Sequence, residues 1–168
     1  MNRGNPSIDG LRGEDGGLDR DAIGRILPYR EPFLFVDKVV RLSSGEIEAE
    51  KRIDPSMEFL EGHFVGFPVM PATLIAEGFG QAGTILVRYN LDDHEAKEIL
   101  ACRIEDARFH SPAYPGETLT YRARLGTMDG RAARPEGEVS AGGRKVATFR
   151  VMVAIVERRA FRRGRGEE

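Results

Sequence analysis

One glutamate is a candidate acid, because it is the only charged residue in a long apolar and glycine-rich stretch. Between Ala72 and Val87, Glu77 alone carries a charge. Burial disfavours the charged form of a carboxyl group, so a carboxyl in such a place can donate a proton near neutral pH. A structural carboxylate, paired with an arginine or bonded to backbone amides, explains this residue equally well.

A histidine and the start of a helix lie close to Glu77 in the sequence. His63 sits in an apolar, glycine-flanked loop, and an imidazole can accept a proton under cellular conditions, although a hydrogen-bonded core histidine is the more frequent explanation. The run Met70–Thr73 would begin a helix, whose free amides can hold a developing oxyanion. A base, an acid and an oxyanion site could remove a proton next to a thioester carbonyl and expel a β-hydroxyl. That reaction needs no metal and no organic cofactor.

The residues that follow Pro71 predict one long helix, since apolar side chains recur every three or four positions from Leu74 to Tyr89. The other positions carry small residues, including Gly78, Gly80 and Gly83. We therefore expect a helix that is buried on all sides and that another backbone approaches closely. A core helix that merely tolerates its glycines explains the pattern as well.

The rest of the chain predicts mainly β-strands. We expect strands over residues 33–42, 47–53, 99–109, 118–125 and 145–156, separated by glycine and proline turns. A short helix, capped by Asp19 and stopped by Pro28, precedes them. These elements predict the α+β class, with one buried helix against an antiparallel sheet.

The composition is that of one soluble globular domain. The chain has 168 residues, of which 40% are hydrophobic and 31% charged, and its formal net charge is −2. This balance argues against a nucleic-acid binder, and no segment is long and apolar enough to span a membrane. A single cysteine builds neither a disulfide framework nor a zinc site. Because no apolar secretory signal follows the N-terminus, we expect a cytoplasmic protein.

The chain divides into three parts by composition. Residues 1–18 are rich in glycine and should form a flexible tail. Residues 19–157 should form the single domain. Residues 158–168 contain five arginines and should form a flexible basic tail.

Three segments resemble the β-hydroxyacyl-(acyl carrier protein) dehydratases of fatty-acid synthesis, the FabZ/FabA type. They read LPYREPFLFVD from residue 27, EGHFVGFPVMPATLIAEGFGQA from residue 61 and FHSPAYPGETL from residue 109. The middle segment is the most specific, because it keeps the family's histidine, the acidic residue fourteen positions later and the Pro-Val-Met-Pro lead into the helix. The resemblance spans about residues 23–156.

The resemblance implies a hot-dog fold, in which an antiparallel β-sheet wraps around one long central helix. It also implies a homodimer with its active sites at the subunit interface, and often a trimer of such dimers. His63 of one protomer would remove the α-proton of an (R)-3-hydroxyacyl thioester, and Glu77 of the other would protonate the departing hydroxyl. The amide of Ala72 would polarise the thioester carbonyl. The product would be a trans-2-enoyl thioester, and glutamate at the acidic position implies the branch that does not isomerise the double bond.

The resemblance also implies a substrate carried by acyl carrier protein or by coenzyme A. An acyl carrier protein is acidic, so basic residues near the tunnel mouth would steer it. The acyl chain would lie in a tunnel whose wall we expect among six residues: Phe64, Phe67, Val69, Phe79, Gln81 and Ile85.

Four positions depart from the family pattern, although none removes a catalytic group. Val65 replaces a proline, Ala72 a glycine, Tyr29 a histidine and His110 an arginine. They suggest a divergent member with a changed substrate or a reduced rate. Two alternatives therefore stay open: a hot-dog thioesterase, and a non-catalytic subunit that binds acyl thioesters or a catalytic partner.

Overall fold

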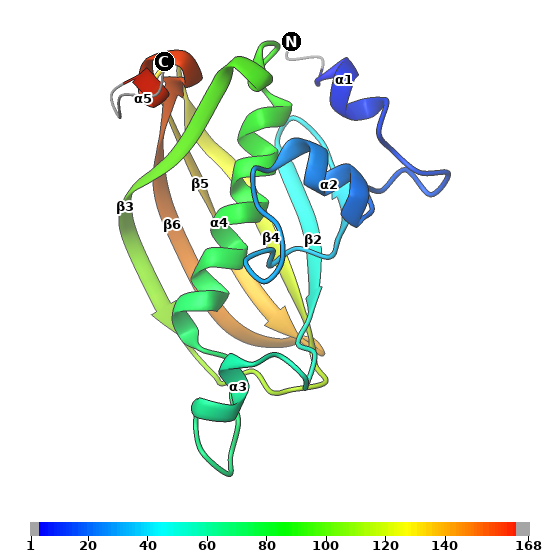
Figure 1. The fold of residues 1–168 in the computed structure, drawn as a ribbon. Coiled ribbons are helices and arrows are strands. Elements are labelled where there is room, and N and C mark those ends of the chain that lie inside the picture. Colours follow the sequence, from blue (N-terminus) through cyan, green and yellow to red (C-terminus); the bar gives the residue numbers. More distant parts are fainter. Residues whose placement is uncertain (1–3, 164–168) are drawn as a thin grey trace.

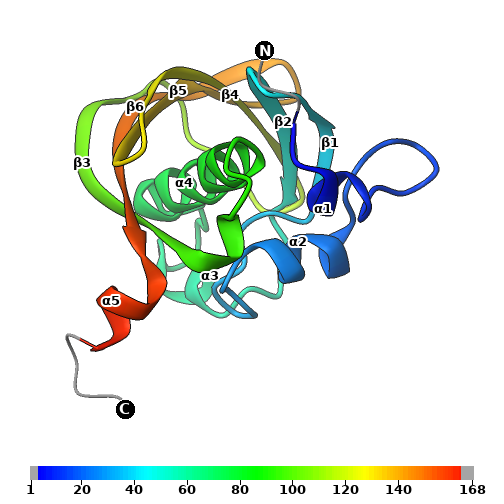
Figure 2. The ribbon, with the colours of Figure 1, turned by 90° about the horizontal axis from the view of Figure 1, so that it is seen from above.

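The computed structural model describes residues 4–163 and shows a curved six-stranded sheet around one long helix (Figure 1). The strands are β1 (Lys38–Leu42), β2 (Glu46–Arg52), β3 (Lys97–Phe109), β4 (Thr118–Met128), β5 (Ala132–Ala141) and β6 (Arg144–Glu157). They pair in the order β1-β2-β4-β5-β6-β3, and every pairing is antiparallel. Seen from above, the sheet curves around the helix, with β3 on one side and β1 and β2 on the other (Figure 2). The predicted α+β class is confirmed.

The central helix α4 (Ala72–Tyr89) has the predicted length, but its two halves differ in burial. Every residue from Gln81 to Tyr89 is buried. Before Gln81, Ala72 is exposed and Glu77 is half-buried. The prediction of a helix buried on all sides is therefore wrong for the first half within one chain, because the single sheet covers only one side of it.

Side chains, not another backbone, approach the glycines of α4. A Cβ atom at Gly78 would overlap the hydroxyl of Tyr121 on β4, and one at Gly83 would lie 3.0 Å from Pro135 on β5. Among residues 4–163, no atom outside α4 itself lies within 4 Å of the Cβ position at Gly80. The expected close approach exists, but the prediction that a backbone makes it is wrong. The small residues let bulky side chains of the sheet pack directly on the helix.

The strands differ from the sequence-based expectation in two places. No strand was predicted where β5 lies. Pro135 and Gly137 interrupt the alternation of apolar and polar residues that marks a strand. The predicted strand over 33–42 begins only at Lys38, because the backbone of Phe33 and Phe35 bonds to the side-chain amide of Gln81 rather than to a neighbouring strand.

Shorter helices complete the fold. They are α1 (Pro6–Asp9), α2 (Arg20–Ile26), α3 (Phe59–Gly62), the 3₁₀-helix η1 (His94–Ala96) and α5 (Arg158–Arg163). The carboxylate of Asp19 accepts a hydrogen bond from the amide of Ala22 at 2.8 Å, which confirms the predicted cap of α2. In Figure 1, α3 lies at one end of α4 and α5 at the other. Among the helices of residues 4–163, none is long and apolar enough to cross a membrane.

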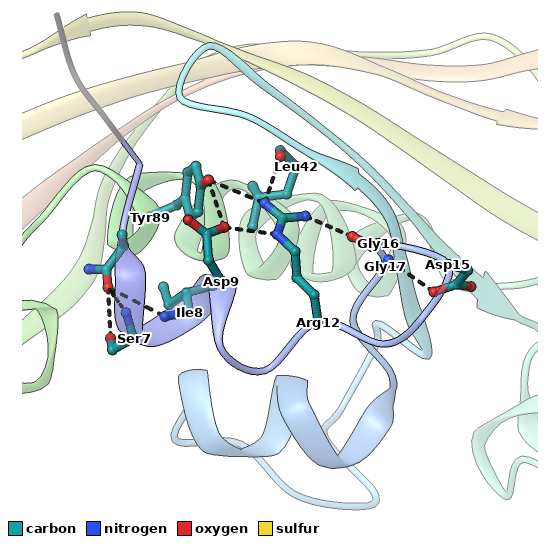
Figure 3. A network of polar contacts seen from close by, with 10 residues as sticks. Ser7, Ile8, Asp9, Arg12, Asp15, Gly16, Gly17, Leu42 and Tyr89 are labelled. Carbon is teal, nitrogen blue, oxygen red and sulfur yellow. Dashed lines mark hydrogen bonds and ion pairs between the residues drawn. The ribbon is translucent and has the colours of Figure 1, made fainter.

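Residues 4–18, here called the N-terminal strap, pack against the domain, so the prediction of a flexible tail is wrong for them. Ile8 has no exposed surface and belongs to the main core. The guanidinium of Arg12 donates to the Asp9 carboxylate at 2.8 Å, to the Leu42 carbonyl at 2.9 Å and to the Tyr89 hydroxyl at 3.2 Å (Figure 3). A few well-placed side chains thus order a segment whose glycine content predicted disorder. Residues 1–3 lie outside the described part.

We expect Ile8→Ala to destabilise the domain by about 2–5 kcal/mol, because it empties a filled core position. Denaturant unfolding of the two proteins measures this difference. Glu14→Ala, in an exposed part of the strap, is the matched control and should stay within about 0.5 kcal/mol of the wild type. Equal and small changes in the free energy of unfolding for both variants would show that the strap does not support the fold.

The prediction of a flexible tail is also wrong for residues 158–163, which form α5. Arg158 pairs with the carboxylate of Glu98 at 2.9 Å, and Arg162 does so at 3.3 Å. Arg88 of α4 approaches the same carboxylate at 3.5 Å. Glu98 therefore fixes the arginine-rich segment to the end of α4 that is farthest from α3 (Figure 1). Residues 164–168 lie outside the described part.

His94 is a buried histidine that the strap covers. Its Nε2 lies 3.0 Å from Ser7 Oγ, which donates its own proton to Asn5 Oδ1 at 2.7 Å. Nε2 therefore carries the hydrogen of a neutral ring. Burial, with the positive charge of Arg88 second, lowers the pKa of His94.

This histidine makes the fold sensitive to acid. Above the pKa of His94 in the unfolded chain, about 6.5, the neutral ring contributes its full stability. This contribution is lost as pH falls through the lower pKa of the folded protein, because the unfolded chain binds the proton first. We expect Tm to fall between about pH 7.5 and about pH 5.5, and to fall less in His94→Gln. Thermal unfolding at both pH values tests this, and equal falls in the two proteins would contradict it.

Candidate active site

The loop that carries His63 is closed by two hydrogen bonds between His63 and Val69. The His63 carbonyl accepts from the Val69 amide at 2.9 Å, and the ring atom Nδ1 lies 2.9 Å from the Val69 carbonyl. His63 itself follows the last residue of α3 and is half-buried. The imidazole is thus held in one orientation by the backbone of its own loop.

The Val69 contact also decides where the ring hydrogen sits. A carbonyl oxygen can only accept, so Nδ1 carries the hydrogen and Nε2 keeps a free lone pair. No group within residues 4–163 forms a hydrogen bond with Nε2. Nε2 of His63 is therefore available as a base.

Glu77 lies in the second turn of α4 and is half-buried. Its Oε1 accepts a hydrogen bond from Nε2 of Gln81, one helical turn further on, at 3.0 Å. The structure pairs it with no arginine in the described residues, and its partner is a neutral amide. The carboxyl group is therefore held in place without a positive charge beside it.

The helix start provides the third component. Pro71 precedes α4, and its carbonyl accepts from the amides of Leu74 and Ile75. Within residues 4–163, the amide of Ala72 meets no acceptor, and this residue is exposed. An 18-residue helix concentrates partial positive charge at this end, so the amide can polarise a carbonyl oxygen.

His63 follows α3, and Ala72 and Glu77 lie in the first two turns of α4. These two elements meet at one end of the fold (Figure 1). No hydrogen bond joins the side chains of His63 and Glu77 within the described part of one chain. No group of three or more histidine, cysteine, aspartate or glutamate side chains in that part could hold a metal ion.

A cleft of about 1100 Å³ opens beside these groups. Gly62, next to His63, and Leu74, three residues before Glu77, both line it. Most of its apolar wall comes from Phe33, Leu34, Phe35, Met57 and Phe59. A volume of this size can accept a drug-sized organic molecule. The cleft thus reaches the neighbours of both candidate catalytic residues, although neither His63 nor Glu77 lines it, and the apolar part of its wall suits an acyl chain.

The six residues expected in the tunnel wall lie in different surroundings. Phe79 and Ile85 are fully buried, and Val69 and Gln81 are also buried. Phe64 and Phe67 are exposed, at 61% and 65% of their surface. The lining of the cleft comes from other residues instead, above all from the segment 33–35, which sequence reasoning did not assign to the site.

The hydrogen bond between Gln81 and Glu77 could have been predicted from the sequence, since residues four apart share one face of a helix.

The four departures from the family pattern lie in distinct places. Val65 is 87% exposed, and Ala72 is exposed as well. His110 is exposed and lies 3.2 Å from the hydroxyl of Thr148. Tyr29 is half-buried. Burial, with the negative charge of Glu77 second, raises its pKa, so the phenol stays protonated.

Comparison with known proteins identifies the family. The profile of the FabA-like domain matches residues 27–150, which is most of the chain. The chain belongs to the FabA-like family. This match includes His63, Ala72 and Glu77 and leaves out the N-terminal strap and α5.

Two curated relatives agree in sequence over most of their length. The chain is 42% identical over 144 residues to the 3-hydroxyacyl-[acyl-carrier-protein] dehydratase FabZ of Nitratidesulfovibrio vulgaris, a match that covers 84% of this chain and 93% of the relative. It is 33% identical over 141 residues to the FabZ of Solibacter usitatus, covering 84% and 87%. The predicted membership of the FabZ/FabA-type dehydratases is confirmed.

Solved structures agree in fold. The dehydratase heterocomplex ApeI:P of Xenorhabdus doucetiae matches with a TM-score of 0.70 at 16% identity, over 86% of this chain and 97% of that one. A mutant thioesterase of Pseudomonas aeruginosa matches with a TM-score of 0.63 at 11% identity, over 83% and 94%. The predicted hot-dog fold is confirmed, and the fold alone is shared by dehydratases and thioesterases.

Proposed function

We propose that this FabA-like protein is a 3-hydroxyacyl thioester dehydratase that acts in fatty-acid or related acyl-chain synthesis. The observation that carries the proposal is the state of His63, whose Nδ1 is bonded to the Val69 carbonyl at 2.9 Å and whose Nε2 is left free as a base. The curated relatives support it, because those named here are 3-hydroxyacyl-[acyl-carrier-protein] dehydratases. As in the prediction from sequence, no cofactor takes part.

The reaction needs one base and one acid. Nε2 of His63 takes the α-proton of the (R)-3-hydroxyacyl thioester, and the electron pair of that C–H bond forms the double bond between C2 and C3. The C3–O bond breaks, and the hydroxyl leaves as water with the proton of Glu77. The product is a trans-2-enoyl thioester. His63 then returns its proton through solvent, and Glu77 regains one.

The helix start lowers the barrier for the first step. Loss of the α-proton moves negative charge onto the thioester oxygen, which the free amide of Ala72 can stabilise. The half of the cleft wall that is aromatic or aliphatic suits the acyl chain. We propose Phe64, Phe67, Val69, Phe79, Gln81 and Ile85 as further parts of the acyl site in the assembled protein.

A homodimer with a shared site is part of the proposal. From Ala101 to Phe109, β3 is an edge strand whose side chains are exposed except for half-buried Asp106, and a long open edge of this kind invites pairing with another strand. Exposed apolar side chains lie on this strand and on the His63 loop: Phe64, Val65, Phe67, Ile104 and Phe109. Together with the half-covered first part of α4, they support a second copy that brings its own His63 to Glu77. A trimer of such dimers is the larger assembly that we propose.

Acyl carrier protein is the proposed carrier of the substrate. Both curated relatives are 3-hydroxyacyl-[acyl-carrier-protein] dehydratases, so this carrier is part of their names. The acidic surface of the carrier protein would be attracted by arginines of this protein. One of them is Arg103 on β3, which forms no ion pair within residues 4–163. Coenzyme A thioesters are the alternative substrates. A cytoplasmic location stays a prediction.

The test is to identify the product by mass. The protein is incubated with 3-hydroxyacyl thioesters of several chain lengths, on acyl carrier protein and on coenzyme A. A dehydratase converts them to thioesters lighter by one water, whereas a thioesterase releases free acids. A non-catalytic subunit would bind the thioesters and change none of them, and either of the last two results would refute the proposal.

A further inference from the structure

Gln81 makes three hydrogen bonds that leave its side-chain amide no freedom. Its Oε1 accepts from the amide of Phe35 at 2.8 Å, and its Nε2 donates to the carbonyl of Phe33 at 2.8 Å and to Oε1 of Glu77 at 3.0 Å. The side chain is 1% exposed. Water therefore cannot replace these partners.

The backbone partners decide which way the amide points. If the amide were flipped, its oxygen would face the Phe33 carbonyl, which can only accept, and its NH2 group would face the Phe35 amide, which can only donate. The observed orientation is the one that satisfies all three partners. An N–H of Gln81 is thus aimed at Glu77 by the fold of a distant segment.

This contact makes the two oxygens of Glu77 unequal. Oε1 is occupied as an acceptor of the Gln81 hydrogen, so a proton on the carboxyl group favours the other oxygen, Oε2. We propose that Gln81 is a positioning residue that fixes the rotamer of Glu77 and leaves Oε2 as the atom that delivers the proton to the departing hydroxyl. This inference rests on the proposed dehydratase function.

The same side chain joins the acid to the wall of the cleft. Phe33 and Phe35 line the cleft, and their backbone groups are the other partners of Gln81. A substrate that moves this wall would therefore move the acid with it. A misplacement of about 1 Å can cost about a hundredfold in rate, so a group that holds the acid and the wall in one frame has a direct effect on kcat.

The test is a double-mutant cycle on kcat, with Gln81→Met and Glu77→Gln measured singly and together. Methionine has a similar length and donates no hydrogen bond. We expect Gln81→Met to lower kcat about tenfold or more in the wild-type background and less than about twofold in the Glu77→Gln background, because Gln81 acts through the proton of Glu77. Far-UV circular dichroism and Tm establish that each variant is folded, and Gln81→Asn takes its place in the cycle if the methionine variant does not fold.

Lys51→Met is the matched control. Lys51 donates to the Leu34 carbonyl at 3.1 Å and so anchors the same segment without touching Glu77. Because Lys51 reaches Glu77 only through this segment, we expect its effect on kcat to differ between the two backgrounds less than the effect of Gln81→Met does. If Gln81→Met has equal effects in both backgrounds, or none, the positioning role is refuted and the dehydratase function stands. If the wild type does not dehydrate any substrate, both the function and this inference are refuted.

Discussion

His63→Ala and Glu77→Gln each lower kcat/KM for dehydration at least about a hundredfold, because each removes one of the two groups that move a proton in the transition state. Alanine at position 63 takes away the free Nε2 that the Val69 contact leaves as a base. Glutamine at position 77 keeps the size of the side chain and an acceptor for Gln81, but it has no proton to give. The measurement is steady-state dehydration of a 3-hydroxyacyl thioester.

Two exposed residues provide matched controls for this pair. His110→Ala and Glu95→Gln make the same chemical changes at sites outside the cleft, and we expect each to stay within about threefold of the wild type. Variants of His63 and Glu77 that keep most of their activity while remaining folded would remove the acid–base assignment. The family membership would be unaffected, and residues other than His63 and Glu77 would have to supply the base and the acid.

Mixing the two inactive variants restores activity if each site takes His63 from one protomer and Glu77 from the other. Random exchange makes about half of the dimers mixed, and each mixed dimer has one intact site of two, so roughly a quarter of the wild-type activity returns. Each variant alone stays at about one per cent or less. The proteins are unfolded or dissociated together, reassembled and assayed against the same treatment of each variant alone.

The single chain supports this arrangement in a specific way. His63 and Glu77 lie at the same end of the fold but share no hydrogen bond within residues 4–163, and the side of α4 that carries Glu77 is only half covered. A mixture of His63→Ala with the double variant His63→Ala/Glu77→Gln has no intact site and should gain nothing. Equal activity in the two mixtures would mean that each site is complete within one protomer.

Local patterns predicted the elements that hold the site. The apolar period after Pro71 predicted α4, and Asp19 predicted the start of α2, because both signals depend on residues close in sequence. The pair His63 and Glu77 was found from residue type and neighbourhood, and its assignment to a family came from the motif around it. The structure adds the contact that makes His63 a base, since a bond from Nδ1 to the Val69 carbonyl depends on how the loop closes.

Contacts between distant segments account for the parts that the sequence did not predict. Gln81 takes the backbone of Phe33 and Phe35 out of the sheet, across more than forty residues of sequence, and this is why β1 begins at Lys38. The N-terminal strap has a composition typical of disorder, and its order comes from Arg12 and the buried Ile8. No local pattern shows that these side chains find partners on β1 and α4.

The most direct test of the central claim is hydration of a trans-2-enoyl thioester in deuterated water, followed by mass spectrometry and NMR of the product. The account predicts an intact 3-hydroxyacyl thioester that carries one deuterium on C2, delivered by the same His63 that removes the proton in the forward reaction, and no deuterium uptake with His63→Ala. A free acid without deuterium on C2 would show thioester hydrolysis, and unchanged substrate would show that the site does not move a proton at this carbon. Either result would contradict the account.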